Sequence, residues 1–263
     1  MRTPTLAVRI IAAGCLSLLF CASGHAATVL ITGSNAGIGL EFAKQYAAAG
    51  WTVIATHRHD TTPATLEDLV GRYKNVRAEK MDVTSAAEVQ GLAQKLEDLP
   101  IDVLINNAAV YADNNDWSTQ EFGHLDYELG TTMMAINAIG PLLVSEAFTH
   151  QVTASTQKKI ISITSTHASI TEPIAGSGAI FYRASKAALN REMRVVADTL
   201  KPQGVIVVLL HPGAVHTERQ TGPKHPVQIE PDFAVKNMRK TIDALTLRDT
   251  GHFLRYDGTT EPW

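Results

Sequence analysis

The 263-residue chain carries a formal net charge of −3, and 45% of its residues are hydrophobic. This is the composition of a globular protein with enough chain for one sizeable core. Because no block of Lys and Arg interrupts the sequence, a nucleic-acid-binding surface is not expected.

The first 26 residues have the pattern of a secretory signal peptide. Arg2 and Arg9 precede an apolar run at 10–22, and small residues suited to cleavage follow it. The apolar run is too short for a transmembrane span. We therefore expect a leader over 1–26 and export of a single domain over 27–263 to the periplasm or the medium.

Other interpretations of the leader stay open. A misassigned start codon would leave a cytoplasmic protein, and an uncleaved leader could adsorb to a membrane. A lipoprotein signal at Cys15 is disfavoured because Arg9 leaves too short an apolar run before it. Cys15 and Cys21 are the only cysteines, so a processed chain would contain neither a disulfide nor a cysteine–metal site.

Short apolar strands alternate with helices along the rest of the chain. The expected strands cover 28–31, 51–56, 76–83, 101–105, 160–163, 205–210 and 252–255. The expected helices cover 38–50, 66–73, 85–99, 129–150, 180–200 and 233–245. Continuously apolar strands predict a sheet covered on both faces. The pattern therefore predicts a single α/β domain, a Rossmann-like three-layer sandwich with a doubly wound parallel sheet of about seven strands.

A glycine-rich loop follows the first expected strand. It reads Thr32-Gly33-Ser34-Asn35-Ala36-Gly37-Ile38-Gly39. Glycines permit a tight turn and close approach to a pyrophosphate, and the next helix supplies amide donors and the positive end of its dipole. Leu40 and Glu41 replace the Lys and Ser/Thr of a Walker A loop. The loop predicts a dinucleotide site, with a purely structural turn as the alternative.

Tyr182 and Lys186 lie four residues apart in the helix expected at 180–200, so their side chains share one face. An ammonium beside a phenol favours the phenolate. The pair could therefore act as an acid/base near neutral pH. The spacing is common by chance, so a solvated helix face is the alternative interpretation.

Together these motifs resemble the classical short-chain dehydrogenase/reductases, and most closely the C-factor and sniffer-type carbonyl reductases. The family's motifs occur in order at 32–39, 82–83, 106–109, 137, 162–165, 182–186 and 212–217. Ala109 departs from the family's glycine in Asn106-Asn107-Ala108-Ala109. The resemblance covers essentially all of 28–263.

The resemblance implies four catalytic residues, Asn137, Ser165, Tyr182 and Lys186. Ser165 would hydrogen-bond the substrate oxygen, and Tyr182 would donate a proton as hydride arrives from the nicotinamide. Lys186 would favour the tyrosinate and hold the ribose, and Asn137 would keep a relay water. Asn137 could instead satisfy helix backbone, Ser165 could cap a strand end, and Ser169 rivals Ser165 on spacing to Tyr182.

The resemblance also implies a set of cofactor-binding residues. They are Gly33, Ser34, Asn35, Gly37, Ile38, Gly39, Arg58, Asp82, Val83, Asn107, Ala108, Tyr182, Lys186, Pro212, Gly213, Val215 and Thr217.

Cofactor preference depends on the end of the second expected strand, where the sequence is Thr56-His57-Arg58. An acidic residue there would bind the ribose 2′-hydroxyl of NAD, whereas Arg58 can pair with a 2′-phosphate. Ser34 or Asn35 could add a hydrogen bond, and Asp60 should point away. We predict a preference for NADP(H), with NAD(H) as the alternative cofactor and a plain surface charge as the alternative role of Arg58.

The expected function is oxidoreduction of a small carbonyl or alcohol compound with NADP(H). Tyr111, Trp117 and Phe181 are candidate pocket walls, and residues 218–231 should cover the substrate. A dinucleotide-binding signalling protein of C-factor type with little turnover is the alternative. The resemblance implies a homodimer or homotetramer.

No metal site is expected. His57 and His59 alternate, and His211 and His216 flank a Pro-Gly turn, but neither pair has a second cluster at metal-ligand spacing. We interpret these histidines as solvated or loop residues. A separate conflict is that free NADPH is a cytoplasmic reagent, whereas residues 1–26 predict export.

Overall fold

A computed structural model describes residues 26–111, 117–171, 178–218, 220 and 223–263. The expected leader therefore lies, apart from Ala26, outside the described residues. The strands are β1 (Thr28–Ile31), β2 (Thr52–His57), β3 (Val76–Lys80), β4 (Val103–Asn106), β5 (Lys159–Ile163), β6 (Ile206–His211) and β7 (Phe253–Arg255). They form one sheet in the order β3-β2-β1-β4-β5-β6-β7, and every neighbouring pair is parallel.

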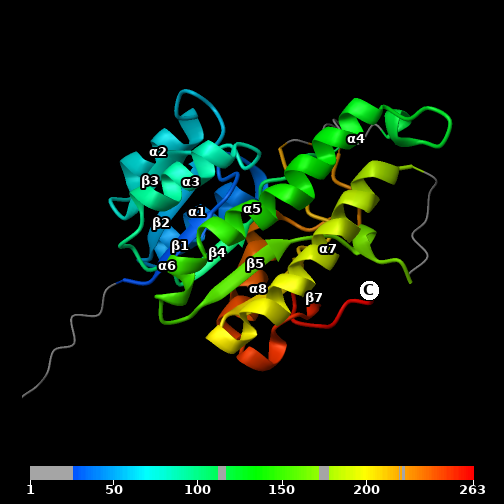
Figure 1. The fold of residues 1–263 in the computed structure, drawn as a ribbon. Helices are drawn as coiled ribbons and strands as arrows, with labels where there is room; N and C mark the ends of the chain where they lie inside the picture. The colour runs from blue at the N-terminus through cyan, green and yellow to red at the C-terminus, as the bar shows by residue number, and fades with distance from the viewer. Residues whose placement is uncertain (1–25, 112–116, 172–177, 219, 221–222) are drawn as a thin grey trace, which may run out of the picture.

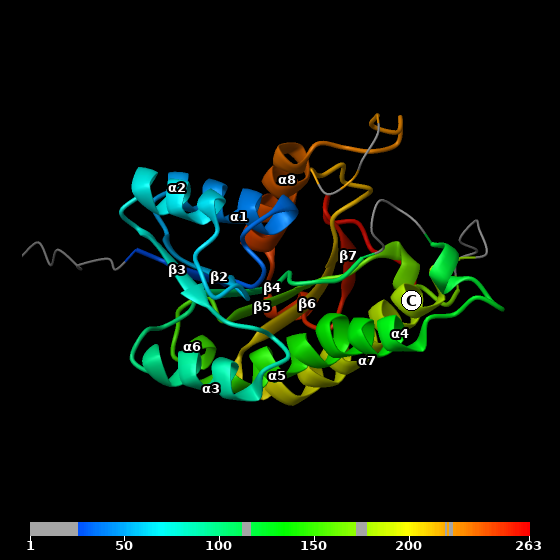
Figure 2. The same ribbon diagram turned by 90° about the horizontal axis from the view of Figure 1, so that it is seen from above.

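Helices cover both faces of this sheet (Figures 1 and 2). One face carries α1 (Gly37–Ala48), α2 (Ala64–Arg72) and α8 (Pro231–Ala244). The other carries α3 (Ala86–Lys95), α4 (Tyr127–Met134), α5 (Gly140–Ala147), α6 (Thr149–Thr153) and α7 (Ile180–Leu200). The predicted doubly wound three-layer fold is confirmed. Among the described residues, no helix is long and apolar enough to cross a membrane.

Every strand except β3 contributes to two hydrophobic cores because successive side chains point to opposite faces. Val29 and Ile31 of β1 pack in the core that includes Phe42 of α1. Leu30, between them, packs in the opposite core with Leu189 of α7. Burial of each large side chain contributes about 1.5–3 kcal/mol, which explains why the central strands are mainly apolar, whereas the edge strand β3 contains Arg77, Glu79 and Lys80.

The direction of the chain along the sheet reverses beside β1. The chain runs outward from β1 through β2 to β3 and then returns to β4 on the other side of β1. In open parallel sheets, this reversal leaves a crevice at the carboxyl ends of the strands. The loops after β1, β2, β4, β5 and β6 therefore converge at one edge of the sheet.

The helix predicted at 129–150 is present and begins at Tyr127, but its hydrogen bonding is not α-helical throughout. It is interrupted by a π-helical turn, Ala135–Ile139, in which the Gly140 amide donates to the carbonyl of Ala135, five residues back. Pro141 follows, and it has no N–H to donate to the carbonyl of Asn137. Turns of this kind often mark functional sites, and this one carries Asn137.

Candidate active site

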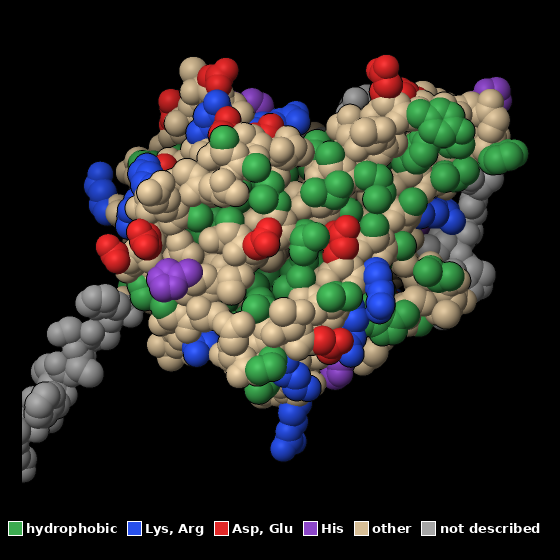
Figure 3. Space-filling view, in the orientation of Figure 1, with side chains coloured by type: hydrophobic (Ala, Val, Ile, Leu, Met, Phe, Trp, Pro, Cys, Tyr) green, Lys and Arg blue, Asp and Glu red, His purple; other side chains and the backbone are tan. Residues whose placement is uncertain are grey.

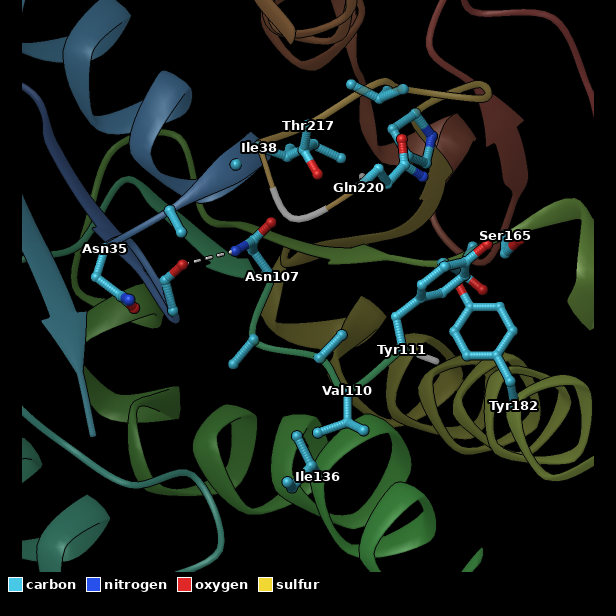
Figure 4. A pocket seen from close by; sticks show the side chains of 18 of the residues that line it. Asn35, Ile38, Asn107, Val110, Tyr111, Ile136, Ser165, Tyr182, Thr217 and Gln220 are labelled. Atoms are coloured by element: carbon cyan, nitrogen blue, oxygen red, sulfur yellow. Dashed lines mark hydrogen bonds between the residues drawn. The ribbon is translucent and has the colours of Figure 1, made fainter. Parts of the chain in front are cut away.

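A cavity of about 800 Å³ opens where these loops converge. It extends from Asn35 and Ile38 at one end to Ser165 and Tyr182 at the other (Figure 4). The predicted site residues that line it are Gly33, Asn35, Gly37, Ile38, Arg58, Asp82, Val83, Asn107, Ala108, Ser165, Tyr182, Pro212, Gly213, Val215 and Thr217. Ser34, Gly39, Asn137 and Lys186 do not line it.

Two glycines of the loop after β1 have no acceptable replacement. Gly33 has a positive φ of 64°, and a Cβ there would come within 2.9 Å of the Cα of Ala108. A Cβ on Gly39 would lie 2.3 Å from the carbonyl oxygen of Gly33. The start of α1 is therefore packed directly against the loop, which brings main-chain amides to the cavity wall.

The N-terminus of α1 lacks a side-chain cap from its own N-cap residue, Ala36. Its first amide, of Gly37, instead donates to the carboxylate of Glu218 at 2.6 Å. A helix N-terminus favours an anion through its dipole and its unpaired amides. Glu218, which sequence reasoning missed, thus places a negative charge where a phosphate group of a dinucleotide would be stabilised.

Asn107 fixes the loop from the neighbouring strand. Its Nδ2 donates to the carbonyls of Thr32 at 2.9 Å and Gly33 at 3.1 Å. The hydroxyl of Thr32 accepts from the amides of Asn107 and Ala108, both at 2.9 Å. These contacts join the ends of β1 and β4 across the point where the strand order reverses.

The expected contribution of Ser34 to cofactor binding is wrong. Its side chain is fully buried, and its hydroxyl donates to the carbonyl of Ile31 at 2.8 Å. Arg58 and Asn35 do line the cavity. The carboxylate of Asp60 pairs with Lys80 at 2.8 Å, so it is held by β3, consistent with the expectation that it points away.

Ser165 follows β5 and lies close to Tyr182 in the cavity (Figure 4). A hydrogen bond joins the two side chains. The Ser165 hydroxyl also accepts from the amide of His167 at 3.2 Å, so it caps the 3₁₀ turn Thr166–Ala168 as well. The rival Ser169 donates to the carbonyl of Trp263 at 3.0 Å and does not line the cavity. The structure therefore brings Ser165, not Ser169, to Tyr182.

Lys186 lies behind Tyr182, with its Nζ 6.0 Å from the centroid of the phenol ring. The Nζ donates to the carbonyl of Ile163 at 2.9 Å. Burial lowers the pKa of Lys186 to about 8. Burial also raises the pKa of Tyr182, Tyr111 adds to that rise, and the hydrogen bond with Ser165 opposes it. Burial is therefore the largest cause of the raised pKa of Tyr182, and the expected role of Lys186 in favouring the tyrosinate stays a prediction.

Asn137 is fully buried in the π-helical turn. Its Oδ1 accepts from the amide of Val110 at 2.7 Å, and its Nδ2 donates to the carbonyl of Val110 at 2.9 Å. Nδ2 also donates to the hydroxyl of Ser185 at 3.0 Å. The side chain therefore ties the segment after β4 to α7. A relay water at Asn137 stays a prediction.

Aromatic rings surround Tyr182. Ring centroids lie 5.1 Å away for Tyr111, 5.8 Å for Trp117 and 5.8 Å for His167. Phe181 was expected to form part of this wall, but it points the other way and packs against Tyr127 at 5.7 Å. Helical geometry explains the error, because adjacent residues on a helix do not face the same side.

Two histidines lie at this end of the cavity, of which sequence reasoning missed His167 and interpreted His211 as a solvated or loop residue. His167 and His211 both line it. His211 is buried, and its pKa is lowered to about 4 by burial, assisted by Arg255 and His167. Burial also lowers the pKa of His167. His211 is the last residue of β6, at the functional edge of the sheet, and that position could have identified it.

The interpretation of the histidines as solvated is wrong for two of them. His57 and His211 are both buried, with only 3% and 8% of their surface exposed. His57 ends β2, and burial is the largest cause of its lowered pKa. Among the described residues there is no group of three or more side chains that could hold a metal ion.

The distribution of charge along the described cavity wall is uneven. Arg58 and Asp82 are its basic and acidic members, respectively, and both follow strands on the β2–β3 side of β1. The end near Tyr182 is lined by Tyr111, His167 and His211 instead. Because the pKa values of both histidines are lowered, these three lining side chains carry no formal charge at neutral pH.

Known proteins share this arrangement. The chain is 38% identical over 164 residues to the C-signal of Myxococcus xanthus, an alignment that covers 62% of this chain and 93% of that protein. An NADPH-bound carbonyl reductase from chicken fatty liver superposes with a TM-score of 0.81 at 29% identity, covering 91% of this chain and all of that one. The Drosophila melanogaster carbonyl reductase Sniffer shares the fold, with a TM-score of 0.79 at 24% identity and coverage of 91% and 100%.

A family model described as short chain dehydrogenase matches residues 27–226. That stretch contains the glycine-rich loop, the segment after β4 that Asn137 ties to α7, and the Ser165–Tyr182 pair. The predicted resemblance to carbonyl reductases of the C-factor and sniffer type is confirmed. The chain belongs to the short-chain dehydrogenase family of oxidoreductases.

Proposed function

We propose that this protein transfers a hydride between NADP(H) and a carbonyl or alcohol compound, with Tyr182 as proton donor and acceptor. The observation that carries the proposal is one continuous cavity with an anion-binding helix N-terminus at one end and the Ser165–Tyr182 pair at the other. A bound nicotinamide dinucleotide supplies or accepts the hydride. The protein supplies position, hydrogen bonds and a proton.

The roles of the side chains follow from their contacts. Ser165 and Tyr182 are joined by a hydrogen bond, so both hydroxyls can meet one substrate oxygen. The raised pKa of Tyr182 keeps its phenol protonated at neutral pH, which suits a proton donor in the direction of carbonyl reduction. We also propose that Lys186, one helical turn further along α7, holds the ribose of the nucleotide and restores the proton, for which its Nζ must leave the carbonyl of Ile163.

NADP(H) is the proposed cofactor. Arg58 and Asn35 line the cavity where the adenosine ribose would lie, and Asp60 is paired with Lys80. An arginine matches a 2′-phosphate in charge and geometry. The NADPH-bound state of the similar chicken carbonyl reductase supports the same choice.

The substrate is proposed to be an uncharged carbonyl compound. The wall near Tyr182 consists of aromatic rings and neutral imidazoles among the described residues. A carboxylate or phosphate on the substrate would find no cation there. A signalling protein that only bound the dinucleotide would have no need of Ser165 and Tyr182 at the catalytic end, so that alternative is not favoured.

The test is NADPH oxidation by the purified protein with a panel of neutral ketones, aldehydes and quinones. We expect turnover in the wild type and its loss in Tyr182→Phe, because removing the hydroxyl removes the proton donor but keeps the ring. NADPH binding, measured by calorimetry, should persist in the variant. Equal turnover in both proteins would refute the role of Tyr182.

We further propose assembly into a homodimer or homotetramer through the face formed by α4, α5 and α7. Hydrophobic side chains gather on this face in the space-filling view (Figure 3). Exposed members of these elements and of the turn between them include Tyr127, Ile139 and Val195. Analytical ultracentrifugation checks this: a concentration-independent monomer would refute it.

Export also remains our proposal, based on the charge and hydrophobicity pattern of residues 1–26. N-terminal sequencing of the protein from fractionated cells tests it. A chain beginning after the small residues at 23–26, found outside the cytoplasm, would support export. An intact Met1 in the cytosol would refute it and would remove the conflict with NADPH supply.

A further inference from the structure

The helix that carries Tyr182 and Lys186 begins without a cap of its own. Its N-cap residue, Ala179, has a positive φ of 66° and makes no side-chain hydrogen bond. The first amides of a helix have no partner within the helix. Tyr182 is the third residue of α7, so its own amide is one of these unpaired donors.

A distant side chain satisfies that donor. Oε1 of Gln120 accepts from the main-chain amide of Tyr182 at 3.0 Å, across 62 positions of sequence. Gln120 is fully buried. It ends the 3₁₀ turn Ser118–Gln120, which precedes α4. The contact therefore joins the segment between β4 and α4 to the backbone of Tyr182.

The same segment also contacts the ring of Tyr182. Trp117, immediately before the 3₁₀ turn, lies 5.8 Å from that ring between centroids. Its Cβ lies so close to Gly178 that a Cβ on that glycine would come within 3.0 Å. Trp117 and Gln120 thus hold Tyr182 at two points, one on the ring and one on the backbone.

We propose that Gln120 is a positioning residue that fixes Tyr182 at the catalytic end of the cavity by capping α7. The proposal rests on the proposed function, in which Tyr182 must meet the substrate oxygen. A misplacement of about 1 Å in a reacting group can cost about 100-fold in rate. Only one of the two polar atoms of Gln120 is used, because its Nε2 has no partner among the described residues.

Because Oε1 of Gln120 makes the hydrogen bond and Nε2 makes none among the described residues, the variants are chosen to change that acceptor. Gln120→Met removes the acceptor while keeping the length of the side chain. Gln120→Glu keeps an oxygen at the position of Oε1. It replaces Nε2, which makes no hydrogen bond among the described residues, so no bond is lost there. Gln120→Asn, a milder change, withdraws the acceptor by one methylene and serves if Gln120→Met does not fold.

Gln151 offers a matched control. It is a second buried glutamine, and its Nε2 donates to the carbonyl of Ala93 at 2.7 Å, on α3. It does not line the cavity. Gln151→Met therefore removes a comparable buried hydrogen bond without touching α7, and it separates general destabilisation from a specific effect on Tyr182.

Two measurements on the full chain test the proposal. Hydrogen–deuterium exchange of the peptide containing Tyr182 should be faster in Gln120→Met and unchanged in Gln151→Met. The kcat of Gln120→Met should fall about 10- to 100-fold, and its Kd for NADPH should be unchanged. Gln120→Glu should restore slow exchange and recover kcat, because a carboxylate oxygen can accept from the amide of Tyr182 at the start of α7 as the amide oxygen does.

The proposal is overturned if Gln120→Met and Gln120→Asn keep wild-type exchange and kcat, or if Gln151→Met lowers kcat equally. If the wild type reduces no carbonyl compound, the proposed function fails, and the kinetic arm fails with it. The exchange experiment still decides whether Gln120 caps α7, so the two failures are distinguishable.

Discussion

Lys186 should make the folded protein less stable at neutral pH than it becomes at alkaline pH. Its side chain is 3% exposed, and no acidic residue contributes to its pKa, which burial lowers from 10.5 to about 8. The Nζ has the carbonyl of Ile163 as its hydrogen-bond acceptor. A charged ammonium in this place is poorly solvated, so folding disfavours its protonated form.

The direction and size of this change in folding stability follow from proton linkage. Between pH 8 and 10.5 the unfolded chain holds the Lys186 proton and the folded chain does not, so stability rises with pH through this window. The full effect is about 3 kcal/mol, at about 1.4 kcal/mol for each pH unit. Below pH 8 the penalty is constant, because both states are protonated.

The perturbation is Lys186→Met, which removes the titrating group and keeps the apolar stem. Urea unfolding at pH 7, 8, 9 and 9.5 gives the free energy of unfolding for both proteins. The wild type should gain about 2 kcal/mol relative to the variant between pH 8 and 9.5. Lys240→Met, an exposed change on α8, should follow the wild type. Parallel curves for wild type and Lys186→Met would refute a depressed pKa.

Three further outcomes follow from the cavity. Arg58→Asp should weaken NADPH binding more than about tenfold and favour NADH, because a charge-assisted contact contributes about 1.5–3 kcal/mol; an unchanged ratio of the two Kd values would exclude Arg58 as the phosphate ligand. Glu218→Gln should tighten NADPH binding about two- to fivefold. The Glu218 carboxylate at the amide of Gly37 competes with the cofactor phosphate for the N-terminus of α1, where a negative charge contributes about 0.3–1 kcal/mol. Calorimetry showing equal or weaker binding would contradict this. Gly39→Ala should lower stability by about 1–3 kcal/mol and abolish NADPH binding, since its Cβ would lie 2.3 Å from the carbonyl oxygen of Gly33; a thermal melt and titration matching the wild type would contradict it.

The fold could be predicted because its signals are local. Continuously apolar strands such as Thr28–Ile31, separated by helical periodicity, allow few topologies other than a covered parallel sheet. The glycine loop was equally readable, since Gly33 and Gly39 serve backbone geometry that no other residue permits. The π-helical turn at Ala135–Ile139 was missed because tertiary bonds of Asn137 accompany it, although Pro141 was a visible signal.

The site was predictable only in part, because contacts between distant parts of the chain position several of its residues. Residues that follow strands, such as Ser165 and Arg58, were found because strand ends meet at one edge. Ser34 was misassigned because nothing in the sequence shows that its hydroxyl turns inward to Ile31. Gln120 and Glu218 were missed because each acts across a long stretch of chain, through contacts to Tyr182 and Gly37 that have no sequence pattern.

Transfer of labelled hydride tests the central claim most directly. A neutral ketone reduced by the wild-type protein with NADPH deuterated at C4 of the nicotinamide should give an alcohol with deuterium on the carbinol carbon, as measured by mass spectrometry. Tyr182→Phe should bind the labelled NADPH and give no labelled alcohol. Consumption of NADPH without deuterium in the product, or labelled alcohol formed equally by Tyr182→Phe, would contradict the account.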